Sequence, residues 1–224
     1  MSVLVVRLAG PMQSWGTQSR FSNRDTGREP SKSGVVGLLC AALGRPRGDP
    51  VDDLAGLMMG VRVAAEGRLA RDYHTALDVA KSGGGPPKEC EPSVRFYLAD
   101  AAFTVGLESA DDGLLRRLDE ALREPYWPIC LGRKSFVPGV PVAVEGAADA
   151  VRPGNLRDVL IGHPRWVGDR HEGRVRFVVE VPASAPGTEP RFDQPVEPRF
   201  DQPVSFATRE FCLRHVMTFF DTPG

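Results

Sequence analysis

The chain has 224 residues, of which 42% are hydrophobic and 25% are charged, and its formal net charge at pH 7 is −1. These values predict a globular protein with a sizeable core. The near-neutral net charge excludes a protein that holds an anionic partner through its overall positive charge. The longest run without charged or strongly polar residues, residues 34–44, is too short to cross a bilayer, and no signal peptide is visible, so no membrane contact is expected.

The charges are distributed unevenly along the chain. Residues 1–48 hold seven Arg and Lys against two acids, whereas residues 100–124 hold seven acids against three bases. Because binding responds to the local field, the N-terminal region is the expected contact for an anionic partner. The four cysteines form no C-x-x-C pair, which favours reduced thiols in a cytoplasmic protein.

The hydrophobic pattern predicts alternating strands and helices over the first part of the chain. In chain order these are a strand at 2–9, a long loop at 10–30, a helix from Ser31 or Ser33 to Gly44, strands at 59–65 and 101–108, a helix at 111–122 and a strand at 128–136. This order is that of a split β-α-β unit and predicts an α+β protein with a ferredoxin-like N-terminal domain, residues 1–138. Two glycines inside the first helix, Gly34 and Gly37, predict that a strand or a ligand approaches its face closely.

Two stretches depart from this regular order. The run GGGPP at 83–87 is incompatible with regular structure and predicts a flexible excursion at about 76–93. Residues 139–224 are rich in Pro and Gly and are expected to form a β-rich C-terminal region. Its expected strands lie at 140–145, 174–181 and 206–220.

The octamer EPRFDQPV occurs twice in succession, at 189–196 and again at 197–204. A period of eight residues with two prolines in each unit fits no solenoid repeat. We interpret it as a tandem duplication inside an exposed loop, where insertions are tolerated, and assign it no function.

The loop and helix start at residues 10–34 are the strongest candidate for binding. Exposed amides at a helix start favour anions, and an aromatic ring can stack on a base of single-stranded RNA. Cations and amides would hold phosphates, while Gln13 would read a base edge and Trp15 would stack. The predicted phosphate contacts are Arg20, Arg24, Arg28, Lys32 and Ser33. The alternative is that Trp15 fills the core and the arginines form a solvated face.

Other motifs carry less chemical information. Residues 27–33 lack the Gly before Lys that a phosphate-binding loop needs, which argues against nucleotide hydrolysis. Arg133 and Lys134 follow a glycine and form either a phosphate clamp or an ordinary charged turn. His74 could act as a general base in metal-free RNA cleavage, or it could simply alternate with Tyr73 along a strand.

No metal or other cofactor is expected from the sequence. Cys212 and His215 are the only close pair of soft ligands, and no second pair completes a set of four.

Several blocks taken together resemble the CasD family, the Cas-five subunit of the type I-E CRISPR complex Cascade. They match in order and spacing over about residues 4–136: LVVRLAGPMQSWG, TGREPSKSGVVGLLCAALG, RDYHT, YLADAAFTV and LGRKS. The resemblance implies a ferredoxin-like domain of the RAMP type with an extended thumb and a β-rich C-terminus. The predicted excursion at 76–93 is short for this thumb, and the duplicated octamer is not part of the family pattern.

The resemblance also implies a function. Members hold the 5′ handle of the CRISPR RNA at one end of the complex, contact the backbone subunit and the large subunit, and lie near the target DNA. Cleavage of the precursor belongs to another type I-E subunit, so the family predicts a binder and not an enzyme. A related type I-C subunit does cleave RNA, which keeps a metal-independent endoribonuclease using His74 as the alternative. A third possibility is an adaptor that touches only protein.

Overall fold

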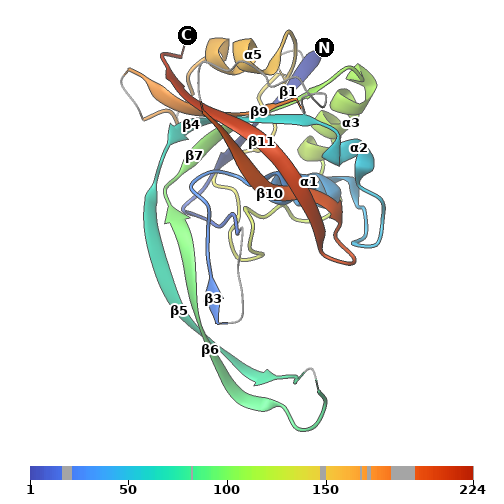
Figure 1. The fold of residues 1–224 in the computed structure, drawn as a ribbon, viewed down its shortest axis with the longest axis vertical. Coiled ribbons are helices and arrows are strands. Elements are labelled where there is room, and N and C mark those ends of the chain that lie inside the picture. Colours follow the sequence, from blue (N-terminus) through green and yellow to red (C-terminus); the bar gives the residue numbers. More distant parts are fainter. Residues whose placement is uncertain are drawn as a thin grey trace.

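A seven-stranded antiparallel sheet forms the body of the protein, in the order β10-β11-β9-β4-β7-β1-β8 (Figure 1). The computed structural model describes residues 1–16, 22–81, 83–146, 150–166, 168–170, 173–182 and 195–223. The strands are β1 (Ser2–Ala9), β4 (Met58–Ala65), β7 (Ala102–Ser109), β8 (Val151–Pro153), β9 (Val175–Val181), β10 (Val196–Ser205) and β11 (Glu210–Asp221).

The helices lie on both faces of this sheet (Figure 1). They are α1 (Lys32–Leu43), α2 (Asp52–Ala55), α3 (Asp112–Arg123) and α5 (Leu156–Gly162). Leu156 and Leu160 of α5 pack onto Gly60, where an added Cβ would lie 2.7 Å from Leu160. Gly60 pairs with Val179, so the next residue, Glu180, points to the opposite face, where it binds α1. None of the helices in the described segments is long and apolar enough to cross a bilayer.

The predicted α+β class is confirmed. β1 and β4 both run antiparallel to β7, so they are parallel to each other with β7 between them and α1 joining them in sequence. The C-terminal strands do not form a sheet of their own, since β9 pairs with β4. Among the described residues, one large buried apolar cluster extends from Val3 in β1 to Phe219 in β11, and a small one holds Ala64, Ala65 and Ala102.

A long hairpin projects from the body (Figure 1). Its arms are β5 (Arg68–Val79) and β6 (Lys88–Ala99), and the short strands β2 (Met12–Gln13) and β3 (Asn23–Arg24) pair with the part of β6 nearest the body. The excursion predicted at 76–93 was therefore too short. Nearly all of β5 is exposed on both faces, so its sequence lacks the alternation that marks a strand packed on a core.

Two predicted strands are wrong. Residues 128–136 form a loop that closes on itself, since the backbone N–H of Leu131 donates to the carbonyl of Phe136 at 2.7 Å. Its apolar residues fill the core from a loop, as Leu131 is fully buried and Phe136 nearly so. Residues 140–145 contribute only an isolated bridge, from Ala143 to Val6.

The predicted strand at 174–181 is confirmed as β9, whereas residues 206–220 begin with a turn before β11 starts at Glu210. Sequence reasoning missed β10, which forms one outer edge of the sheet. The second octamer, 197–204, forms most of β10 and is thus not part of an exposed loop. Residues 189–194 of the first octamer lie outside the described residues.

Candidate nucleic-acid interface

Gln13 and Trp15 lie beneath the predicted RNA-binding loop and not on its surface. The Gln13 amide is fully buried, and it donates to the carbonyls of Leu8 at 3.2 Å and Ala101 at 2.7 Å. Its oxygen accepts from the indole N–H of Trp15 at 3.2 Å. Trp15 is 1% exposed and packs on Gly34 of α1, whose added Cβ would lie 2.8 Å from the ring. Through these contacts the two side chains attach the loop to the sheet and to α1.

Lys32, a predicted phosphate contact, is turned inward. Its ammonium group is 2% exposed and donates to both carboxylate oxygens of Glu180, at 2.9 and 3.0 Å, and to the amide oxygen of Gln202 at 3.0 Å. Burial lowers the pKa of Lys32, and the attraction of Glu180 opposes that shift. The prediction that Lys32 faces a phosphate does not fit this geometry, because C-terminal strands bring a carboxylate to it.

The predicted anion site at the start of α1 is filled by the protein itself. The backbone N–H of Lys32 donates to the Asp201 carboxylate at 2.8 Å, and Ser31 caps the helix by accepting from the N–H of Gly34 at 3.3 Å. Asp201 is held by two hydrogen bonds from Arg214, at 2.6 and 3.0 Å. Ser33 is half-buried, with its hydroxyl 3.5 Å from that of Ser31. The helix start therefore already binds an internal anion.

Three arginines meet where the hairpin leaves the body, and we call Arg24, Arg95 and Arg133 the junction cluster. Arg24 in β3 pairs directly with Arg95 in β6. Arg133 comes from the loop at 131–136, and its guanidinium donates to the carbonyls of Phe96 at 3.0 Å and Arg24 at 3.5 Å. Burial, followed by the neighbouring charge of Arg95, lowers the pKa of Arg133. The cluster brings three positive charges together from three separate segments, and the carboxylates of Asp72 and Asp25 lie near enough to Arg133 to oppose part of their repulsion.

Backbone contacts hold the loops beside the junction cluster together. The N–H of Ser14 donates to the carbonyl of Leu131 at 3.0 Å, and the N–H of Gly27 donates to the carbonyl of Trp15 at 2.7 Å. Gly132 has a φ of +92° and its Cα faces the Ser14 carbonyl so closely that no side chain fits. The glycine of the L-G-R-K stretch is therefore needed for the approach of two loops.

The remaining predicted contacts separate into exposed and undescribed residues. Arg24, Arg28 and Lys134 are exposed, and Arg133 is partly buried. Arg20 lies outside the described residues. Sequence reasoning missed Arg95, although the alternation in VRFYLA around it was the signal for a strand that offers one charged side chain to a surface.

His74 stands on the exposed hairpin, with Asp72 of the same strand beside it. Its Nδ1 lies 3.7 Å from the carboxylate of Asp72, and both side chains are about half exposed. Lys88, on the other arm of the hairpin, is paired with Glu91 at 2.7 Å. In the described part of the chain, no group of three His, Cys, Asp or Glu side chains could hold a metal ion.

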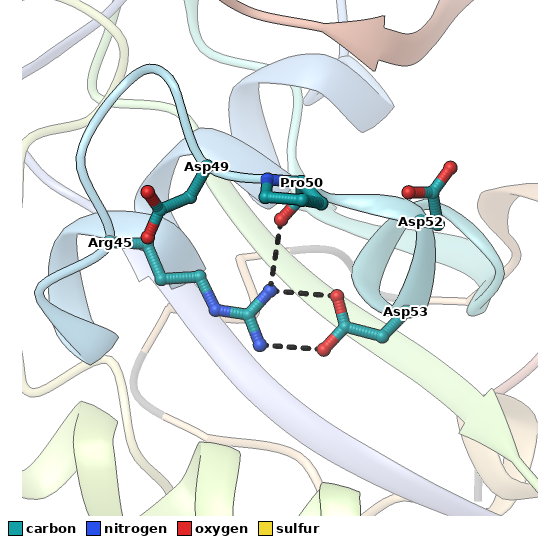
Figure 2. Close-up of a pocket in the computed structure, with 5 residues that line it drawn as sticks. All are labelled: Arg45, Asp49, Pro50, Asp52 and Asp53. Atoms are coloured by element: carbon teal, nitrogen blue, oxygen red, sulfur yellow. Dashed lines mark hydrogen bonds and ion pairs between the residues drawn. The ribbon is translucent and has the colours of Figure 1, made fainter.

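A separate hollow lies in the loop between α1 and α2, and Figure 2 shows Arg45 pointing across it. Arg45 makes two hydrogen bonds to Asp53, at 2.7 and 2.6 Å, and a third to the carbonyl of Pro50 at 3.4 Å. Asp49 and Asp52 also line this hollow (Figure 2). The hollow has three carboxylates and one arginine that is already paired. Its net negative charge would repel the phosphates of a nucleic acid.

Comparisons with known proteins identify chains that are similar to this one. The chain is 37% identical over 149 residues to the CRISPR system Cascade subunit CasD of Escherichia coli (strain K12), a match that covers 60% of this chain and 66% of the relative, just under two thirds of its length. A crystal structure of a Cas protein has 36% identity and a TM-score of 0.74, with 99% of this chain and 97% of that chain covered. A chain of a CRISPR RNA-guided surveillance complex has 31% identity and a TM-score of 0.77, with coverage of 99% and 90%.

These matches confirm the resemblance to the CasD family that the sequence blocks suggested. The model of the family CRISPR-associated protein (Cas_Cas5) matches residues 3–217, and therefore includes the hairpin and the C-terminal strands. Because that match spans nearly the whole chain, the protein belongs to the Cas_Cas5 family of CRISPR-associated proteins.

Proposed function

We propose that this chain is a non-catalytic RNA-binding subunit of a type I-E Cascade complex that holds the 5′ handle of the CRISPR RNA and works in the cytoplasm. The observation that carries the proposal is the junction cluster, in which Arg24, Arg95 and Arg133 gather at the base of the hairpin. Exposed Arg28 and Lys134 would add phosphate contacts. The names of the relatives, a Cascade subunit and an RNA-guided surveillance complex, support this function.

The proposal includes a ferredoxin-like domain of RAMP type and protein partners. The neighbouring order β4-β7-β1-β8 supports that domain. On the hairpin, Leu69, Tyr73 and Leu77 are each about two-thirds exposed and recur every fourth residue on one face of β5. Three exposed apolar side chains, on a face that also carries Arg71 and Thr75, support a contact with the Cascade backbone subunit. The large subunit and the target DNA would lie beyond it in the complex.

Charge reversal on the surface tests the RNA contact. We expect Arg24→Glu with Lys134→Glu to weaken binding of repeat-derived RNA at least tenfold and to reduce the salt slope by about 1.4, since each single-strand phosphate contact contributes about 0.7. The matched control reverses two exposed arginines of α3, Arg116→Glu with Arg117→Glu, and should leave the affinity unchanged. Affinity and salt slope measured over a titration of KCl check this. Equal effects of the two double variants would contradict the assignment.

The same preparation distinguishes the endoribonuclease alternative. We expect no product when the protein is incubated with repeat RNA in EDTA, because among the described residues Asp72 is the side chain that pairs with His74, at 3.7 Å. A product that disappears in His74→Ala would overturn the non-catalytic assignment.

A further inference from the structure

A pocket of about 220 Å³ opens between the end of the long N-terminal loop and the outer strand β10. Gly27, Glu29 and Pro30 line one side of this loop–β10 pocket, and Arg199 and Phe200 line the other. On the basis of the proposed function, we propose that the loop–β10 pocket receives one unpaired base of the bound RNA, with Phe200 stacked on the base.

A bulge in β10 turns the Phe200 side chain outward. A shift in register leaves Phe200 and Asp201 together opposite Leu213 of β11. Asp201 faces the start of α1 and is 8% exposed, whereas Phe200 is 67% exposed. Among the described residues, the Phe200 ring stacks on no other aromatic ring. Its open face is therefore available to a base, as aromatic faces are in proteins that bind single strands.

Arg199 offers a hydrogen-bond donor on the same side of the pocket. Its terminal nitrogen donates to the Glu197 carboxylate at 3.1 Å and lies 3.2 Å from that of Glu29. Its Nε is buried, and no group among the described residues accepts from it. Buried donors in folded proteins nearly always have a partner, and the edges of bases carry carbonyl oxygens and ring nitrogens that accept. A base in the pocket would complete the bonding of Arg199.

Ion pairs compensate the carboxylates around the pocket and hold its walls in place. Glu29 pairs with Arg176 of β9 at 2.8 Å as well as with Arg199, and Asp201 pairs with Arg214 at 2.6 Å. Because both carboxylates are paired, the pocket does not repel an RNA strand. Walls that are fixed before the RNA binds also reduce the entropy lost on binding.

Arg28 connects the loop–β10 pocket with the junction cluster. It is exposed and stands in the chain between Gly27 and Glu29, which both line the pocket. It follows Arg24 by four residues, so the two Cα atoms lie no more than about 14 Å apart. One RNA strand can therefore place phosphates at both arginines while a base turns into the pocket. The stacking expected of Trp15, which is buried, would come from the other end of the chain.

Removing the ring tests the pocket in the full-length protein. We expect Phe200→Ala to weaken binding of repeat-derived RNA at least fivefold, because base–aromatic stacking contributes that much or more to affinity. The salt slope should stay the same, since stacking releases no counterions. Phe200→Tyr, which keeps the ring, should retain the parent affinity. Phe220→Ala removes another exposed ring, from β11, and is the control that should bind RNA normally.

The outcomes distinguish failure of the pocket from failure of the proposed function. Parent affinity in Phe200→Ala would overturn the pocket, and the proposed function would stand if Arg24→Glu with Lys134→Glu still weakened binding. A parent chain that bound no RNA would overturn both. The thermal midpoint of Phe200→Ala should equal that of the parent, because the ring is exposed. Reduced co-elution with the backbone subunit at unchanged RNA affinity would assign the pocket to a protein side chain and overturn the base assignment.

Discussion

Lys32 has sequence neighbours that predict a binding residue, but its role in the fold is structural. It stands at a helix start between two serines, yet its ammonium is held by Glu180 and Gln202 from strands about 150 residues later. Local pattern predicted the helix start and its attraction for anions correctly. It could not predict that Asp201 would satisfy that attraction, because the pairing depends on the path of the C-terminal strands.

Replacing this lysine should destabilise the fold. We expect Lys32→Met to lower the free energy of unfolding by about 3–5 kcal/mol, since it leaves Glu180 buried with its main partner removed. Urea denaturation followed by circular dichroism measures the change. Lys134→Met, at an exposed position, should stay within about 0.5 kcal/mol of the parent chain. Similar stabilities for both variants would show that the buried pair contributes little.

At the level of elements, the sequence predicted those whose residues face a core. The strands expected at 2–9, 59–65 and 101–108 agree with β1, β4 and β7 to within one residue at each end, because buried strands are dense in Val, Leu and Phe. β5 and β10 were missed for the opposite reason. One is exposed on both faces, and the other buries a carboxylate that only its partners make acceptable.

The two glycines of α1 give a matched test of why this helix tolerates them. An added Cβ at Gly34 would lie 2.8 Å from the Trp15 ring, whereas at Gly37 the nearest atom, of Phe206, is 3.8 Å away. We therefore expect Gly37→Ala to stabilise the protein by about 0.5–1 kcal/mol through helix propensity, and Gly34→Ala to destabilise it. Thermal unfolding of both variants checks the signs. A stabilising Gly34→Ala would mean that Trp15 is not packed on α1.

The contact between Trp15 and α1 also shows which parts of the candidate site the sequence predicts at the level of elements. The glycines predicted a close approach to the helix face, and the approaching group is the Trp15 ring, not a ligand or a strand. Sequence reasoning located the loops that line the interface and two of its exposed arginines. The junction cluster as a whole could not be predicted, since Arg24, Arg95 and Arg133 meet only after the hairpin has paired with β3.

At the scale of the whole molecule, the body and the hairpin differ in how their side chains are partnered. Charges in the body are largely paired internally, as between Arg176 and Glu29 at 2.8 Å, while the hairpin exposes an apolar face on β5. A surface of this kind adds little to the stability of the isolated chain, because its side chains remain in water.

We expect Tyr73→Ala with Leu77→Ala to leave the thermal midpoint unchanged and to reduce co-elution with the backbone subunit and RNA at least tenfold. The reason is that the double variant removes apolar area from the hairpin without touching the core. His74→Ala, which lies between them in sequence and so points to the other face, is the control and should co-elute normally. Retained assembly in the double variant would place the contact elsewhere.

The prolines of β10 determine how the sheet can meet other molecules. Pro198 and Pro203 lie in the outermost strand, where they have no N–H to donate to an incoming backbone. A neighbour cannot lengthen the sheet by adding a strand of its own along this margin. Crowded copies of the protein are thereby protected from joining edge to edge, and recognition along this side is left to side chains.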